Sequence, residues 1–77
     1  MNWAAEQRQR FIDKCLAEKG QVNRSDLIEA FAISERQAAS DFGGYIHQAP
    51  DNMSYDRERK AYVRGGKFRR VYSERDA

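Results

Sequence analysis

Residues 33–46 read ISERQAASDFGGYI, and this stretch predicts the helix around which the fold is organised. Ser34 is followed three residues later by Gln37, which is the S-x-x-Q pattern of a helix capping box. At 100° per residue, one face of this helix gathers its apolar side chains: Ala38, Phe42, Tyr45, Ile46 and Ala49. The opposite face gathers small or hydrogen-bonding residues: Arg36, Ser40, Gly43 and His47, with Gln37 and Gly44 beside them. We therefore expect an amphipathic helix over about residues 34–48, whose smooth outer side can lie deep in a groove.

The adjacent glycines Gly43 and Gly44 allow a second interpretation of this helix. Each glycine inside a helix costs about 1 kcal/mol relative to alanine. That cost is useful if the helix must approach a ligand closely. Alternatively, the pair only kinks or ends the helix, and the residues alone leave both interpretations open.

The segment before residue 34 predicts a second helix and a tight turn. Asn23 can cap this helix, with Asp26 three residues later in a near capping box. Its apolar stripe contains Leu27, Ile28 and Phe31. Only about three residues, 32–34, separate the two helices, and Ile33 would fill the angle between them. A short helix, a tight turn and a second capped helix are typical of a helix-turn-helix.

Another helix is expected toward the N-terminus, over about residues 4–19, with Gly20 ending it. One face carries its apolar residues: Ala4, Ala5, Phe11, Ile12, Cys15 and Leu16. Trp3 would project from roughly the opposite side, where it contacts a second subunit or folds back as the helix end frays; we expect the fold-back. After this helix, Val22 is expected to pair briefly as an extended residue.

The segment that follows the amphipathic helix predicts a turn and a β-hairpin. Pro50 stands at the second position of a turn over residues 49–52. Two short strands are expected over residues 53–56 and 61–64. The tip between them, residues 57–60, reads RERK and is charged.

Most aromatic residues are assigned to the core, and this group contains Phe11, Phe42, Tyr45, Tyr55 and Tyr62. In the hairpin, Tyr55 and Tyr62 are expected to pair across the strands. Phe68 and Tyr72, four residues apart, would form a last apolar anchor.

These elements predict a mainly α fold with a small β-hairpin, which is the winged helix-turn-helix of three helices plus a wing. The chain has 77 residues, enough for one domain, which we place at residues 1–72 with a flexible tail at 73–77. Residues 1–56 hold 6 Lys+Arg and 9 Asp+Glu, whereas residues 57–77 hold 8 and 3. This basic end is either a contact for a polyanion or a solvated, partly disordered tail.

The chain contains one cysteine, Cys15, and one histidine, His47. They are too few for an internal disulfide or a structural zinc site. Cys15 is expected to be a buried small hydrophobe, and His47 to be exposed without a role or near a phosphate. No histidine–nucleophile pair or phosphate-binding loop is found, so we expect neither an enzyme nor a cofactor. The longest apolar run is four residues, 30–33, and no signal peptide precedes it, so we expect no membrane span and a cytoplasmic location.

Residues 22–63, VNRSDLIEAFAISERQAASDFGGYIHQAPDNMSYDRERKAYV, give the chain a family resemblance. The matching residues are Asn23, Arg24, Ser25, Asp26, Leu27, Phe31, Ile33, Ser34, Gln37, Ala38, Ser40, Asp41, Phe42, Tyr45, Pro50, Asn52, Tyr55, Asp56, Lys60, Tyr62 and Phe68. With these, about residues 8–70 resemble the N-terminal DNA-binding domain of WYL-domain transcriptional regulators, especially those that control bacterial phage-defence loci. Those regulators continue into a dimerisation and ligand-sensing domain. We therefore expect either an excised domain or a short stand-alone regulator.

The predicted function is sequence-specific binding of double-stranded DNA, with the amphipathic helix in the major groove. Arg36 is the best candidate to read a base, because its fork matches two acceptors of guanine. Gln37 can pair with adenine or complete the capping box, and Ser40 suits a base edge or a phosphate. Asp41 is the exception on this helix, since DNA repels a carboxylate; we expect it to pair with a nearby arginine or lysine.

Further candidates would contact the DNA backbone, and they are Arg24, Ser25, Ser34, Arg57, Arg59, Lys60, Arg64 and Lys67. Ser34 and its helix N-terminus favour a phosphate, and the hairpin tip would reach the backbone or the minor groove. Arg69 and Arg70 add sequence-independent attraction.

Each assignment has a simpler alternative, in which these polar side chains are only solvated. The rival function is a winged helix that binds a partner protein instead of DNA, for which Trp3 is the best support. If the chain binds DNA, we expect a repressor that binds as a homodimer to an inverted repeat.

Overall fold

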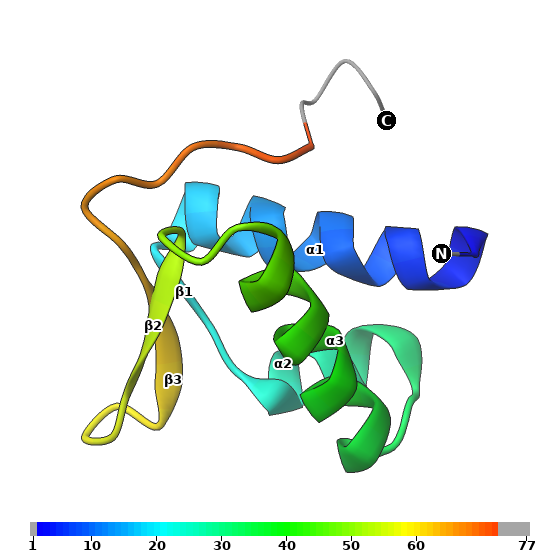
Figure 1. The fold of residues 1–77 in the computed structure, drawn as a ribbon. Helices are drawn as coiled ribbons and strands as arrows, with labels where there is room; N and C mark the ends of the chain where they lie inside the picture. Colours follow the sequence, from blue (N-terminus) through cyan, green and yellow to red (C-terminus); the bar gives the residue numbers. More distant parts are fainter. Residues whose placement is uncertain (1, 73–77) are drawn as a thin grey trace.

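The computed structural model describes residues 2–72, which form three helices and a small antiparallel sheet (Figure 1). The elements follow one another as α1 (Trp3–Lys19), β1 (Gln21–Val22), α2 (Arg24–Phe31), α3 (Glu35–Gln48), β2 (Met53–Asp56) and β3 (Ala61–Arg64). The expected fold class, a mainly α domain of three helices plus a wing, is confirmed. The tail expected over residues 73–77 lies outside the described residues. Within residues 2–72, no helix has the length and apolar character needed to cross a membrane.

Local capping determines where α1 begins and ends. The side chain of Asn2 accepts a hydrogen bond from the Ala5 N–H at 2.8 Å, so α1 starts one residue before the expected position. Gly20 ends the helix as expected, with a left-handed φ of 78° and its N–H donated to the Leu16 carbonyl at 3.1 Å.

The helix-turn-helix formed by α2 and α3 also begins with caps. Asn23 and Asp26 form the expected capping box of α2, with both reciprocal bonds at 2.9 Å. Ser34 caps α3 by accepting from the Gln37 N–H at 3.1 Å. Only this half of the second capping box forms, and the Gln37 side chain is turned toward Asp41, to which its Nε2 donates.

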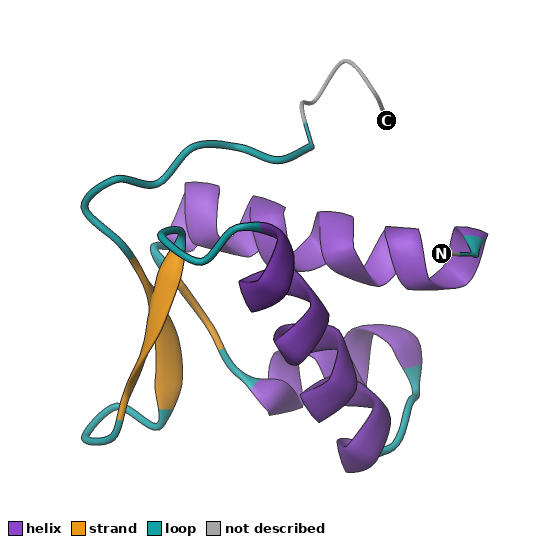
Figure 2. Ribbon diagram, in the orientation of Figure 1, coloured by secondary structure: helices purple, strands orange, loops and turns teal. Residues whose placement is uncertain are grey.

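The sheet has the strand order β1-β3-β2, and both pairings are antiparallel. Strands β2 and β3 have the expected bounds and pair Tyr55 with Tyr62, whose rings meet edge to face at 5.1 Å. Val22 pairs with Tyr62 on the other side of β3, which confirms its brief extended pairing. The Asn52 N–H closes the expected turn around Pro50 with a 3.0 Å bond. Figure 2 shows the sheet at one side of the helices, where β2 and β3 form the wing.

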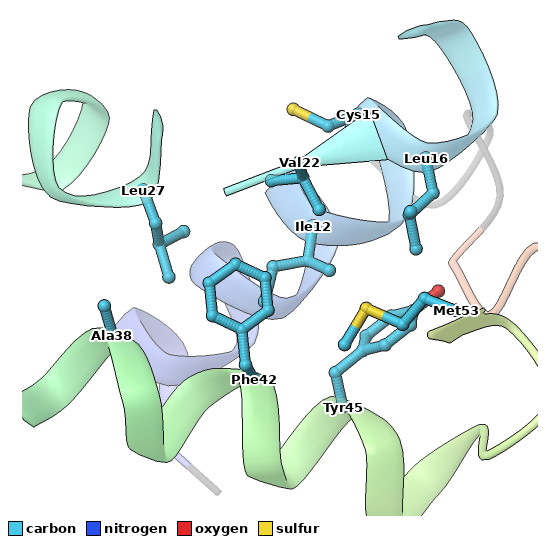
Figure 3. Close-up of a cluster of buried hydrophobic side chains, with 9 residues drawn as sticks. All are labelled: Ile12, Cys15, Leu16, Val22, Leu27, Ala38, Phe42, Tyr45 and Met53. Carbon is cyan, nitrogen blue, oxygen red and sulfur yellow. The ribbon is translucent and has the colours of Figure 1, made fainter. Parts of the chain in front are cut away.

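The hydrophobic core fills the space between the three helices and the sheet (Figure 3). Its buried members are Ile12, Cys15, Leu16, Val22, Leu27, Ala38, Phe42, Tyr45 and Met53. Phe42 stacks on Tyr62 with ring centroids 4.4 Å apart, which joins α3 to β3. Burial raises the pKa of the Cys15 thiol, in keeping with a buried hydrophobe rather than a nucleophile.

Some apolar side chains expected inside lie at the surface instead. Trp3 is 76% exposed, so the expected fold-back is wrong. Asn2 caps α1 and keeps this end of the chain helical. Ile46 is 39% exposed, at the margin of the apolar face of α3. Tyr55 is 53% exposed because it shares the face of buried Met53 but lies nearer the hairpin tip, where the core ends. Ala4 is also exposed.

Helix α3 continues through both glycines to Gln48, so the interpretation that they end the helix is wrong. A Cβ added at Gly43 would meet nothing within 4 Å. A Cβ added at Gly44 would lie 3.4 Å from Nε2 of Gln9, which is an ordinary contact with a side chain of α1. Neither glycine is therefore required by packing inside the described part of the chain.

Asp13 forms a buried polar cluster that holds the segment after β3 against α1. Its carboxylate accepts from the Tyr45 hydroxyl and the Arg70 Nε, each at 2.6 Å, and from the N–H groups of Val71 and Tyr72, each at 3.0 Å. Burial alone would raise the pKa of Asp13, but these hydrogen bonds outweigh it and lower the pKa below the ordinary value. Arg70 therefore has a partner inside the fold, which sequence reasoning placed on the DNA side.

Candidate nucleic-acid interface

The outer face of α3 is the first part of the candidate interface. Ala38, Phe42 and Tyr45 bury the inner face against the core. Because residues on the opposite side of a helix then point outward, Arg36 and Ser40 are both exposed. The structure thus places these two predicted base readers on one solvent-facing surface.

Gln37 is the third predicted base reader, and it differs from the other two because it is half-buried. Its Nε2 donates to Oδ1 of Asp41 at 3.1 Å. Asp41 is only 5% exposed, and its Oδ2 accepts from Nε of Arg8 at 2.6 Å. The expectation that Asp41 pairs with an arginine is confirmed, and the partner comes from α1.

A groove between the start of α2 and the wing is the second part of the interface. Its volume is about 400 Å³, and its lining residues are Asn23, Arg24, Ser25, Tyr55, Arg59, Lys60 and Tyr62. Four of these were predicted to contact the DNA backbone, namely Arg24, Ser25, Arg59 and Lys60. The structure therefore brings together residues that lie more than thirty positions apart in the sequence.

The charges in this groove are largely available to an anion. Lys60 and Arg24 are exposed, and Arg59, with 66% of its side chain exposed, lies 3.8 Å from Oδ2 of Asp56. An exposed pair at that distance contributes little, so Arg59 can exchange it for a phosphate. Ser25 donates its hydroxyl to Oδ1 of Asn23 at 2.6 Å.

Tyr55 is a lining residue that sequence reasoning assigned to the core. A usable signal was its distance from the turn: only Asp56 separates it from the charged tip, where few other residues are available to cover a ring.

The segments that carry these side chains lie at one end of the molecule. Figure 1 shows that the wing tip, drawn in yellow, and the first turn of α3 both point toward the bottom of the view, with the start of α2 between them. Ser34, which caps α3, is exposed at this end. Arg57 is exposed at the wing tip.

Two predicted backbone contacts are not part of this surface. Arg64 ends β3 at the far end of the hairpin from the tip, and its Nη1 donates to the carbonyls of Leu16 and Ala17 at 3.3 and 3.0 Å. A cation there suits the negative end of the α1 dipole. Lys67 is exposed beyond β3, away from the groove-lining residues.

A separate, mainly apolar hollow of about 370 Å³ lies between α1 and the end of α2. It is lined by Trp3, Ala4, Gln7, Arg8, Phe31 and Ile33. Trp3 is the most exposed large apolar side chain of the described residues.

Comparison with known proteins places these features in a family context. Residues 4–77 match the family described as the BrxR transcriptional regulator winged helix-turn-helix domain. The DNA-binding transcriptional repressor CapW of Escherichia coli (strain KTE188) is 43% identical over 70 residues, which cover 91% of this chain and 23% of that protein. CapW of Stenotrophomonas maltophilia is 36% identical over 77 residues, which cover 100% of this chain and 26% of that protein. CapW of Pseudomonas aeruginosa is 39% identical over 70 residues, which cover 91% of this chain and 23% of that protein. The chain thus spans about a quarter of the length of these relatives.

Proposed function

Because the chain belongs to the winged helix-turn-helix family of BrxR transcriptional regulators, we propose that it binds double-stranded DNA with sequence preference. The observation that carries this proposal is the pairing of a polar, exposed outer face on α3, which carries Arg36 and Ser40, with a groove lined by Arg24, Arg59 and Lys60. In Figure 1 the wing tip, the start of α2 and the first turn of α3 lie at one end of the molecule. In the proposed complex α3 enters the major groove, which admits a helix and presents a distinct pattern at each base pair.

The proposed base readers are Arg36, Gln37 and Ser40 on the outer face of α3. The fork of Arg36 matches the O6 and N7 acceptors of guanine, and the amide of Gln37 matches the N6 and N7 groups of adenine. Ser40 lies one turn after Arg36 and suits a base edge or a phosphate.

The proposed backbone contacts combine α2, the start of α3 and the wing. Arg24, Ser25, Arg59 and Lys60 line the groove and would hold the backbone there. The N-terminus of α3 at Ser34 suits a second phosphate, since its N–H groups and dipole favour an anion. Arg57 would reach the backbone or the minor groove from the tip. Arg64 already binds the end of α1, and Lys67 is not among the residues that line the groove. Both would therefore contribute only long-range attraction.

We further propose that the chain represses transcription, as the names of its CapW relatives say of those proteins. A module of this size buries only about 600–1,000 Å² on DNA. Binding as a homodimer to an inverted repeat, with half-site centres about 34 Å apart or a multiple of that, would give adequate affinity. Because the chain resembles regulators of phage-defence loci, the proposed target is the DNA of such a phage-defence locus. The proposed location is the cytoplasm.

A second candidate function is supported by the hollow beside Trp3, which suits a partner protein. In that case the winged helix would be an interaction module without base-specific DNA binding. Neither function requires catalysis.

The test is binding of the purified chain to the DNA immediately upstream of its own gene, against scrambled duplex, at two salt concentrations. We expect a preference for the upstream DNA that survives the higher salt, because base contacts depend on salt less than phosphate contacts do. Equal, salt-sensitive binding to both duplexes would show that only charge is engaged and would contradict sequence preference. No binding at low salt would favour the protein-interaction function.

A further inference from the structure

A carboxylate joins the interior of the domain to the outer face of α3. Asp41 accepts from Arg8 of α1 through Oδ2 at 2.6 Å and from Gln37 through Oδ1 at 3.1 Å. The exposed side-chain fractions of Arg8 and Asp41 are 13% and 5%, so the ion pair is largely shielded from water. Gln37 is therefore the point at which an internal ion pair reaches the proposed DNA-binding surface.

The ion pair sets the direction of the Gln37 amide. An ionised carboxylate only accepts hydrogen bonds, whereas a glutamine amide donates through Nε2 and accepts through Oε1. Nε2 must therefore face Asp41, because the reversed amide would place two acceptors against each other. Oε1 and the second N–H of Gln37 are left for another partner. The position of the acceptor relative to the donor is then fixed.

A fixed order matters for reading a base. Adenine presents a donor at N6 beside an acceptor at N7, and a glutamine amide matches that pair only in one orientation. A free amide can turn over and offer the opposite order at the same place. We propose that Asp41, held by Arg8, is a positioning residue that fixes the amide of Gln37 and thereby sets the base preference at one position. This inference rests on the proposed function, in which α3 lies in the major groove.

Arg8 has two effects in this arrangement. Its guanidinium compensates the largely buried charge of Asp41, which would otherwise be costly. It also offsets the repulsion between that carboxylate and the DNA phosphates. The pair explains why a DNA-facing helix tolerates Asp41.

The experiment compares base preferences of variants of the full chain. Preferred duplexes are first selected from a random library with the unaltered chain, and each position is then changed singly and measured in competition. A competition ratio does not depend on the folded fraction, so a destabilised variant still gives a valid result. The variants are Asp41→Asn, Gln37→Ala and their combination. Asp51→Asn serves as the matched control, because Asp51 is an exposed carboxylate in the turn after α3.

We expect Asp41→Asn to lower the preference at one base position by about fivefold or more. Fivefold is the smallest effect expected when a bidentate contact to a base is lost. The position should be the one that Gln37→Ala also affects, and the preference at the Arg36 position should be unchanged. In the Gln37→Ala background, Asp41→Asn should change base preference no further. Asp51→Asn should leave every preference intact.

Retained preference in Asp41→Asn, or an equal loss at all positions, would overturn the inference while leaving the proposed function in place. Independent, additive effects of Asp41→Asn and Gln37→Ala would also overturn it. Absence of any base preference in the unaltered chain would instead refute the proposed function itself, and this inference with it.

Discussion

Two groups of arginines look alike in the sequence and differ in what they contact. Arg36 and Arg57, the outward group, are exposed, and their side chains make no hydrogen bond or ion pair within residues 2–72. Arg8, Arg64 and Arg70 form what we call the inward group, because their side chains bind other parts of the fold: Asp41, the carbonyls that end α1 and Asp13. Arg64 does so at the surface and stays exposed. The inward group stabilises the domain, and the outward group remains available to DNA. A count of basic residues therefore overstates the interface, and the two groups should respond differently to substitution.

The largest expected effect concerns the inward group. Asp13→Ala removes one partner of Arg70 and leaves the Tyr45 hydroxyl and two backbone N–H groups without their acceptor. We expect the free energy of unfolding to fall by about 3 kcal/mol, measured by urea denaturation. Arg57→Ala, from the outward group, should change it by less than about 0.5 kcal/mol. A loss below about 1 kcal/mol in Asp13→Ala would contradict the assigned role of this cluster.

The same cluster predicts a dependence of stability on pH. The pKa of Asp13 is lower in the folded chain than its ordinary value of 3.8, despite the opposing effect of burial. The resulting stabilisation is present above that ordinary value and is lost as the pH falls through the lowered pKa. Urea midpoints should therefore drop from about pH 6 to about pH 2 more steeply in the unaltered chain than in Asp13→Asn. Parallel pH profiles would argue against this contribution.

Sequence reasoning succeeded where the signal is local. Asn23 and Ser34 predict helix starts, Pro50 predicts a turn, and the strand pattern gives the bounds of β2 and β3. These features depend on a few neighbouring residues, whose preferences act before any packing.

It failed where a side chain meets a distant element. Whether Arg64 and Arg70 bind the fold depends on how the end of β3 and the segment after it meet α1, which no local pattern encodes. Asp13 and Asn52 are buried polar residues that gave no signal, because their partners lie far along the chain. Asp41 is the informative exception: a carboxylate on a DNA-facing helix is anomalous enough to imply a cation nearby.

The third prediction concerns the outward group. Arg36→Ala should weaken binding to the preferred duplex by about 1–3 kcal/mol and relax the preference at one base position. The alanine variant loses the proposed hydrogen bonds from the guanidinium to one guanine. The fold should be undisturbed, because this side chain is exposed. Competition between single-base variants of the duplex measures this. Lys14→Ala, an exposed cation on α1, is the control and should leave base preference unchanged. Equal weakening on every duplex would mean that Arg36 contacts only phosphate.

The fourth prediction compares Arg59, an exposed arginine of the wing, with Arg64 of the inward group. Arg59→Ala should weaken binding to all duplexes alike and reduce the salt slope by about 1, with stability unchanged. Arg64→Ala should lower the free energy of unfolding by about 1 kcal/mol, because it loses its bonds to the end of α1. Its salt slope should change less than that of Arg59→Ala. Salt titrations and urea denaturation of both variants provide the comparison, and the reverse pattern would show that the groups are wrongly divided.

The smallest expected change in stability concerns the outer face of α3. Gly43 lies inside a continuous helix, and an added Cβ would meet nothing within 4 Å. Gly43→Ala should therefore raise the free energy of unfolding by about 0.5–1 kcal/mol, since alanine loses less backbone freedom in a helix. If the glycine is present so that α3 can approach DNA closely, the same variant should bind the preferred duplex more weakly. Ala39→Gly, at another exposed position of α3, is the reverse control for helix stability. A more stable Gly43→Ala chain with unchanged affinity would show that this part of α3 stays clear of the DNA. The contact surface would then end near Ser40, one turn earlier along the helix.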